Sequence, residues 1–80
     1  MAISDTIRGF ISANFYVANA SDLTDEASLL DKGIVDSTGV LEVITFLEEE
    51  FGIKIEDAEM IPDNLDTIGN ITAFVTRKRA

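Results

Sequence analysis

The 80-residue sequence contains no cysteine and no histidine. Without cysteine, the chain can form no disulfide bond, no thiolate nucleophile and no cysteine-ligated metal site. Without histidine, it also lacks the usual general base near neutral pH, so a Ser-His-Asp or Cys-His catalytic site cannot be built from this chain alone. The two absences argue against a free-standing hydrolase or transferase, and we predict that the protein is not an enzyme.

Basic residues are scarce as well. Six lysines and arginines stand against fifteen aspartates and glutamates, which gives a formal net charge of −9. Such a surface repels nucleic acid, because nucleic-acid binding needs Lys and Arg to displace counterions. It attracts and steers partners that carry basic patches. We therefore expect protein partners and no nucleic acid, and we expect so charged a small domain to be a monomer.

Long apolar runs are also missing. No run approaches the ~18 residues of a membrane span, and the N-terminus shows neither the charged region nor the apolar region of a signal peptide. We expect a cytoplasmic protein with no membrane span. The hydrophobic fraction of 46% is ordinary for a globular protein, and 80 residues suffice for one small core. The expected organisation is a single domain, residues 1–80.

Apolar residues at helical spacing predict a helix near each end of the chain. The first extends from about Ser4, a candidate N-cap, to about Phe15. The last begins after a cap at Asp66 or Thr67 and ends in the basic cluster 77–79, which complements the negative end of the helix dipole.

Between the helices, the pattern is less regular. Residues 16–36 predict a long loop, with a short turn of helix around 26–30. Residues 53–55 predict an extended connection, and residues 56–61 a turn or two of helix that ends near Pro62. The predicted fold class is all-α: a small three-to-four-helix bundle with a long loop between the first and second helices.

The most informative stretch is residues 33–52, which predicts a loop, a helix start, a two-faced helix and a stop. Asp36 or Ser37 can cap the helix, and Gly52 can end it in the left-handed conformation. Gly33 predicts the bend before the cap. At about 100° per residue, one face is apolar: Val40, Val43, Ile44, Leu47 and Phe51. The other is solvated: Thr38, Glu42, Thr45, Glu48 and Glu49, with Leu41 at the border.

Ser37 lies where a helix N-terminus favours negative charge, including a phosphate. A serine without a base is a poor nucleophile, and a lone helix-start serine most simply serves as a cap worth about 1 kcal/mol. The surrounding chain changes this interpretation. A long loop leads to the serine, an amphipathic helix follows it, and the chain lacks its own thiol and imidazole. These features together fit a protein that is modified on serine and performs no chemistry itself.

Asp36-Ser37 at the head of a helix that ends in Leu-Glu-Glu-Glu-Phe-Gly (residues 47–52) resembles the phosphopantetheine attachment site of acyl and peptidyl carrier proteins. The resemblance covers nearly the whole chain and is best over residues 28–52. It implies that a phosphopantetheinyl transferase attaches 4′-phosphopantetheine from coenzyme A to Ser37, with Asp36 as part of the motif. The arm would hold acyl or aminoacyl intermediates as thioesters, in fatty-acid or in aminoacyl and peptide biosynthesis.

The resemblance also implies which surface the transferase and the loading and processing enzymes would read. It is the helix face that follows the serine. The corresponding residues here are Thr38, Leu41, Glu42, Thr45, Glu48 and Glu49. From the residues alone, the same face is a solvated acidic face, and such a face can steer a basic partner.

Two residues and one spacing depart from the common pattern of the family. Thr38 stands where the family usually has leucine, and Gly39 follows inside the first turn, where it loosens the helix start. Two residues separate Gly33 from Asp36, where many carriers have one. This spacing and the Asp-Ser-x-Gly ending of the motif (residues 36–39) are more similar to stand-alone aminoacyl carriers of the D-alanyl type than to fatty-acid carriers.

Two alternatives remain beside the carrier. The first is an acidic helical adaptor without a prosthetic group, which would tolerate the loss of Ser37. The second is an EF-hand loop from Asp31 to Glu42, which matches at its first and twelfth places. Gly33 and Val35 stand where that loop needs oxygen ligands, so no metal site is predicted.

Overall fold

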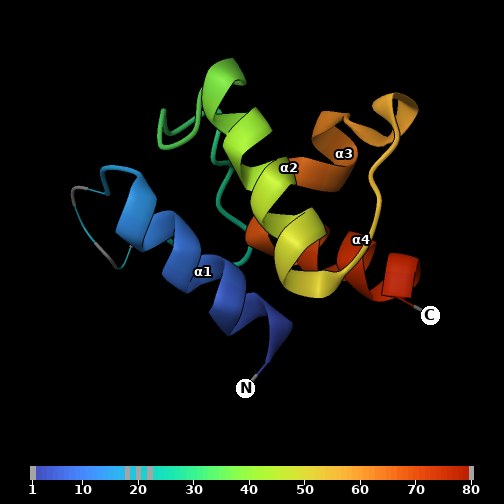
Figure 1. Ribbon diagram of the computed structural model, residues 1–80. Helices are drawn as coiled ribbons and strands as arrows, with labels where there is room; N and C mark the ends of the chain where they lie inside the picture. Colours follow the sequence, from blue (N-terminus) through green and yellow to red (C-terminus); the bar gives the residue numbers. More distant parts are fainter. Residues whose placement is uncertain (1, 18, 20, 22, 80) are drawn as a thin grey trace.

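The computed structural model describes residues 2–17, 19, 21 and 23–79. The described chain forms α1 (Ile3–Asn14), α2 (Ser37–Phe51), the 3₁₀ helix η2 (Asp57–Glu59), α3 (Pro62–Leu65) and α4 (Ile68–Arg79). These residues include no strand, and a long loop joins α1 to α2 (Figure 1). The predicted all-α bundle is therefore confirmed.

The core is built around α4, which packs against α1, α2 and α3. Ile68, Ile71 and Val75 of α4 have no exposed surface, and Phe74 is 2% exposed. They meet apolar side chains from one face of α1 and one face of α2. These are Ile7 and Ile11 of α1 and Val43, Ile44 and Leu47 of α2. The predicted apolar face of the central helix is thus confirmed, with Val40 and Phe51 half-buried at its margins.

The start of α1 differs from the prediction. The helix begins at Ile3, with Ala2 at the N-cap position and no side-chain cap. The carbonyl of Ala2 accepts hydrogen bonds from the amides of Asp5 and Thr6, at 3.1 and 3.3 Å. The first turn of the helix therefore begins before Ser4. Ser4 lies inside that turn, and its prediction as the N-cap is wrong.

The predicted turn of helix at residues 26–30 is also wrong, because this segment forms a series of turns. Its conformation is set by Asp66, far along the chain. The Ser28 hydroxyl donates to the Asp66 carboxylate at 2.7 and 2.8 Å, and the Leu30 amide donates to it at 3.2 Å. The Leu29 amide donates to the Asp66 carbonyl at 2.8 Å. These long-range bonds replace the local bonds of a helix.

The second half of the chain follows the prediction in outline. Residues 53–55 are extended, and residues 57–59 form one 3₁₀ turn. Pro62 occupies the first turn of α3, a position that suits proline because its missing N–H has no partner there. It therefore begins a short helix, where the prediction had it end one. Thr67 caps α4, since its Oγ1 accepts from the Asn70 amide at 2.9 Å.

The basic residues at the end of α4 contact the neighbouring elements. The Lys78 ammonium lies 2.9 Å from the Glu59 carboxylate of η2. The Arg79 guanidinium lies 5.7 Å from the ring centroid of Phe51, at the end of α2. These contacts add to the predicted role of the basic cluster, which is to complement the negative end of the α4 dipole. No helix in the described part of the chain is long and apolar enough to cross a membrane.

Candidate functional site

Ser37 is the first residue of α2, and Asp36 is its N-cap. Asp36 Oδ1 accepts from the Gly39 amide at 2.6 Å, and the Asp36 carbonyl accepts from the Val40 amide at 2.9 Å. Asp36 therefore performs the capping that the sequence left open between the two residues. The Ser37 side chain is exposed, and its hydroxyl makes no hydrogen bond to any described residue.

The start of α2 offers a place for an anion. The first four amides of an α-helix have no partner inside the helix. Here Asp36 satisfies those of Gly39 and Val40, while the amides of Ser37 and Thr38 have no acceptor among the residues described. Free amides and the helix dipole both favour negative charge at this end. A phosphate bonded to the Ser37 hydroxyl would lie beside them.

The loop before α2 delivers the chain to this position. The Leu29 carbonyl accepts from the amides of Ile34 and Val35, at 3.0 and 3.2 Å. Gly33 has a φ of 69°, which confirms the predicted bend. The Val35 side chain is 2% exposed and anchors the loop in the core. The serine is thus held at the end of a tethered turn.

Gly39 has a role that the sequence did not indicate. It is buried, and a β-carbon there would lie 2.7 Å from Phe15 Cε1 and 3.2 Å from Asp36 Oδ1. The ring of Phe15 therefore packs directly against the backbone of the first turn of α2. Glycine permits this close approach, in addition to the looser helix start that was expected of it.

The structure brings five of the six predicted partner-face residues together on the exposed side of α2. They are Thr38, Leu41, Glu42, Thr45 and Glu49. Leu41 is 59% exposed and adds apolar surface to this face. Glu48 differs, because it is half-buried and its Oε2 accepts from the Ile55 amide at 2.9 Å. This bond holds the extended segment 53–55 against the end of α2, so Glu48 has a different role from the other five residues.

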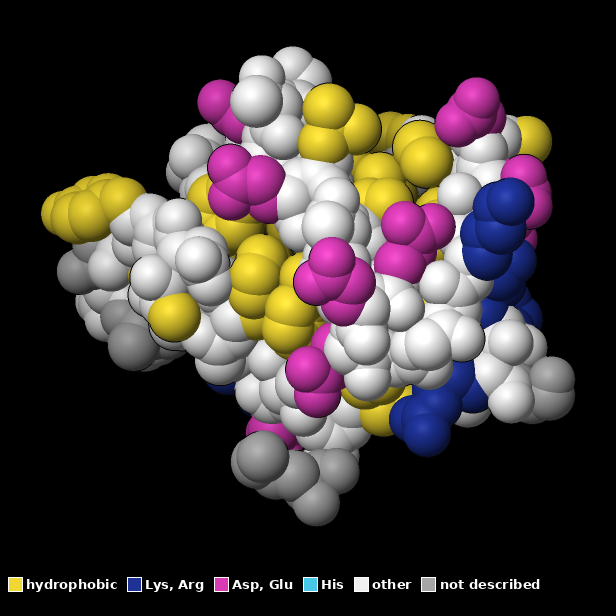
Figure 2. All heavy atoms as spheres, viewed as in Figure 1, with side chains coloured by type: hydrophobic (Ala, Val, Ile, Leu, Met, Phe, Trp, Pro, Cys, Tyr) yellow, Lys and Arg dark blue, Asp and Glu magenta, His cyan; other side chains and the backbone are white. Residues whose placement is uncertain are grey.

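Charge is distributed unevenly around this face. Figure 2 shows acidic side chains spread over the side formed by α2, whereas Lys and Arg gather at the edge where α4 ends. A partner that approaches the start of α2 from this side therefore meets negative charge first. Such a field favours basic partners and speeds their association.

A hollow of about 310 Å³, which we call the α2–α3 hollow, opens beside Ser37. Leu41 and Ile44 of α2 line it on one side and Met60 and Ile61 on the other. Ile61 is 43% exposed and Leu30, also in the lining, 39%. An extended chain attached to the serine would find apolar surface there. The start of α2 and this hollow therefore fit a phosphate-linked arm.

These features define a class of protein. The domain presents an exposed, unbonded serine hydroxyl at a helix start, and its sequence supplies neither histidine nor cysteine to activate that hydroxyl. An accessible serine at a helix start, with free amides and an apolar hollow beside it, is the arrangement expected of a carrier domain.

Comparison with known proteins gives the family. The model of the family described as "Phosphopantetheine attachment site" matches residues 5–75. The acyl carrier protein of Thermotoga maritima is 30% identical over 76 residues, which cover 95% of this chain and 90% of that protein. The D-alanyl carrier protein of Streptococcus sanguinis is 35% identical over 69 residues, 86% of each chain, and that of Streptococcus gordonii is 36% identical over 64 residues, 80% of each.

The chain belongs to the phosphopantetheine-attachment family of carrier proteins. It is a carrier and not an enzyme, and its prosthetic group is a covalently attached 4′-phosphopantetheine. A transferase and further partner enzymes act on such a protein. Membership of this family does not favour the alternative of an acidic adaptor without a prosthetic group.

Proposed function

We propose that Ser37 is the residue to which the arm is attached, and that Asp36 holds it in place. The observation that carries the proposal is the unbonded, exposed hydroxyl at the first residue of a 15-residue helix. Asp36 caps the helix through Gly39, which leaves the hydroxyl of Ser37 free to react. The amides of Ser37 and Thr38 would then donate to the phosphate oxygens.

The residues of the chain indicate which steps the transferase performs and which this protein performs. The chain has no histidine or cysteine, so the transferase must remove the proton of the Ser37 hydroxyl. When attached, the arm supplies a thiol that can hold an acyl group as a thioester. The chain itself holds the base of the arm and lets its apolar part lie against the α2–α3 hollow.

The partner face is the second part of the proposal. We infer that loading and processing enzymes read Thr38, Leu41, Glu42, Thr45 and Glu49, with Glu48 at the margin. Support comes from their shared exposure along α2, directly after Ser37. We place this work in the cytoplasm and expect a monomer, because a net charge of −9 opposes self-association.

The proposed cargo is an acyl or aminoacyl group, and the aminoacyl class is favoured. Two relatives with 35% and 36% identity are D-alanyl carrier proteins. The spacing from Gly33 to Asp36 and the residues Thr38 and Gly39 point the same way. A small amino acid on the arm is therefore the first cargo to test.

The test is the intact mass after incubation with coenzyme A and a broad-specificity phosphopantetheinyl transferase. We expect one added phosphopantetheine on the wild type and on the control Ser12→Ala, an exposed serine of α1, and none on Ser37→Ala. Circular dichroism confirms that all three are helical. Addition to Ser37→Ala would refute the assignment. No addition to folded wild type, while a known carrier is modified in parallel, would favour the adaptor.

A further inference from the structure

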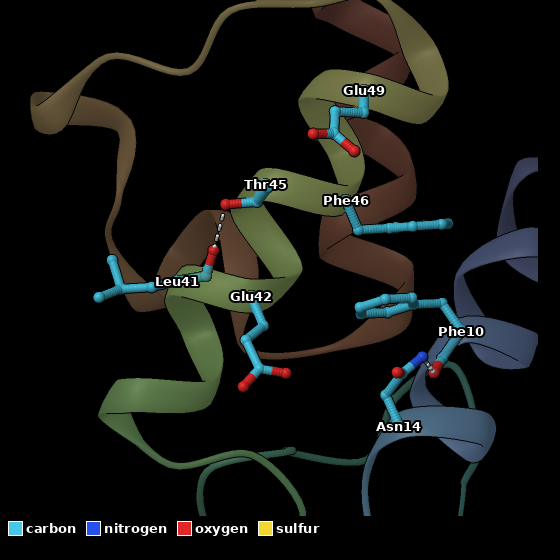
Figure 3. Close-up of a pocket in the computed structure, with 7 residues that line it drawn as sticks. All are labelled: Phe10, Asn14, Leu41, Glu42, Thr45, Phe46 and Glu49. Carbon is cyan, nitrogen blue, oxygen red and sulfur yellow. Dashed lines mark hydrogen bonds between the residues drawn. The ribbon is translucent and has the colours of Figure 1, made fainter.

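A groove of about 400 Å³ lies between α1 and α2, beyond the exposed face of α2 itself (Figure 3). Phe10 and Asn14 line it from α1. Its α2 side is formed by Leu41, Glu42, Thr45, Phe46 and Glu49. We call this the α1–α2 groove. Phe46 was outside the predicted apolar face, and neither Phe10 nor Asn14 was expected at a binding surface.

The two phenylalanines form an aromatic surface inside the groove. Their rings stack with centroids 4.0 Å apart and an angle of 14° between the planes (Figure 3). Phe15 and Phe51 meet them edge-on, at 6.2 and 6.3 Å, and hold the stack from both ends. Both stacked residues remain half-buried in the free protein. An apolar side chain that covered them would remove further aromatic surface from water.

Carboxylates flank this surface on the α2 side. Glu42 and Glu49 are seven residues apart, which is two helical turns or about 10 Å, and both are exposed. Neither makes a hydrogen bond or an ion pair with a described residue, and no Lys or Arg occurs among the described residues that line the groove. Arg8, the basic residue of α1, is engaged by Asp5 and Asp25. The groove therefore lacks a positive partner for its two charges.

The uncharged polar side chains of the lining, Asn14 and Thr45, each donate one hydrogen bond within their own helix. The Thr45 hydroxyl donates to the Leu41 carbonyl at 3.0 Å, and Asn14 Nδ2 donates to the Phe10 carbonyl at 2.9 Å. The amide oxygen of Asn14 accepts no hydrogen bond from the described residues. An incoming donor would thus find acceptors on both walls: Asn14 on α1 and the glutamates on α2.

We propose that the α1–α2 groove docks a basic segment of a partner enzyme. One aromatic or leucine side chain would cover Phe10 and Phe46, and arginine or lysine residues one turn before and after it would meet Glu42 and Glu49. Charge complementarity carries this choice of occupant. The proposal extends the partner face onto α1, and it rests on the proposed function in that the partner acts on the arm.

The location connects the groove with the arm. Leu41 lines both the α1–α2 groove and the α2–α3 hollow that contains Ser37. It forms the ridge between them, and Ser37 lies one turn earlier on α2. A segment seated in the groove therefore places its enzyme next to Leu41, one helical turn from the proposed attachment point of the arm.

The test is a titration of the ¹⁵N-labelled protein, followed by amide chemical shifts. The probe is a short amidated peptide with a central phenylalanine, arginines one turn to either side, and alanine and glutamine elsewhere. We expect shifts centred on Phe10, Asn14 and Phe46. Asn14→Arg should weaken binding roughly fivefold, through repulsion at the rim. The matched control Ser12→Arg adds the same charge about 200° around α1, outside the groove, and should bind as the wild type does.

Three results would overturn the proposal. One is the absence of any peptide-induced shift at low salt. Another is shifts confined to other surfaces, such as the α2–α3 hollow. The third is equal weakening by Asn14→Arg and Ser12→Arg, which would mean attraction by net charge alone. The titration needs no arm transfer, so its failure leaves the attachment at Ser37 untouched, and a failed attachment leaves the titration readable.

Discussion

The ring of Phe15 lies against the backbone of Gly39, so that the residue after α1 closes over the first turn of α2. A β-carbon at position 39 would approach Phe15 Cε1 to 2.7 Å, closer than real carbon contacts. The same β-carbon would lie 3.2 Å from Asp36 Oδ1, the capping atom. This contact links the end of one helix to the cap that leaves Ser37 free.

The first prediction concerns Gly39→Ala. Alanine improves helix propensity by ~1 kcal/mol, but overpacking costs about 1–3 kcal/mol. We expect a net loss of about 1 kcal/mol in the free energy of unfolding, measured in urea. Gly9→Ala is the matched control, because a β-carbon at position 9 of α1 would meet nothing within 4 Å. It should stabilise by up to ~1 kcal/mol. Equal stabilisation by both changes would contradict the close packing.

The second prediction concerns the bonds between Asp66 and the loop. Asp66→Ala removes the acceptor of Ser28 and Leu30, and hydrogen bonds to a charged group are worth about 1.5–3 kcal/mol. We expect a loss of about 2 kcal/mol in the free energy of unfolding and faster hydrogen exchange at Leu30. Ser28→Ala should cost less, and its cost should shrink when Asp66 is already alanine, because the bonds between the two are then gone. What remains is the bond from the Asp31 amide to Ser28 Oγ, at 3.1 Å. Additive losses in the double variant would show that Ser28 and Asp66 contribute independently, against the hydrogen bond between them.

The third prediction concerns pH. A hydrogen bond from the Glu56 amide, and then the Lys78 ammonium, hold the pKa of Glu59 below its ordinary value of 4.5. Because the folded-state pKa is the lower one, the stability that Glu59 contributes is present above the unfolded value and disappears as pH falls through the folded value. Glu59→Gln should therefore lower Tm at neutral pH, and the difference from wild type should close in acid.

The control for this pH series is Glu50→Gln, which removes an exposed carboxylate of α2 and changes the net charge by the same amount. Thermal unfolding of the three proteins from neutral pH to below the ordinary pKa of 4.5 gives the comparison. A Tm difference for Glu59→Gln that stays constant across this range would show that the carboxylate does not act through its charge.

The fourth prediction tests the acidic face of α2. Glu42→Lys with Glu49→Lys should reduce the efficiency of loading by partner enzymes about tenfold, mainly through KM, and the reduction should shrink at high salt. Both residues are exposed, so stability should change little. Glu50→Lys combined with Glu26→Lys makes the same change in net charge at exposed positions that do not line the α1–α2 groove. If both double variants are impaired equally, the face has no specific role.

The elements that local sequence determines could be predicted. The bounds of α2 followed from Asp36, which caps the helix with its own side chain, and from Gly52, whose φ of 64° ends it. The apolar faces followed from helical spacing, because the buried side chains repeat every three or four residues. Ser37 could be singled out for the same reason, since its position depends on these local signals.

The features that were missed depend on contacts between distant segments. Asp66 sets the conformation of the loop at residues 28–30. No pattern in the sequence of that loop indicates that it binds a residue so far along the chain. The stack of Phe10 on Phe46 needs the two helices to be placed first. In the sequence, Glu48 cannot be distinguished from the neighbouring glutamates. It differs in the structure because it accepts a hydrogen bond from the Ile55 amide. The α1–α2 groove is a product of such contacts, which explains why the sequence predicted only one of its walls.

The most direct test of the central claim is to locate the arm within the modified protein. Trypsin cleaves after Lys32 and Lys54 and releases residues 33–54, in which Ser37 is the single serine and Thr38 and Thr45 are the other hydroxyl residues. Fragmentation of this peptide by mass spectrometry reports which residue carries the added mass. We predict phosphopantetheine on Ser37 alone. Its presence on Thr38, on Thr45 or in another peptide would contradict the assignment of the attachment site.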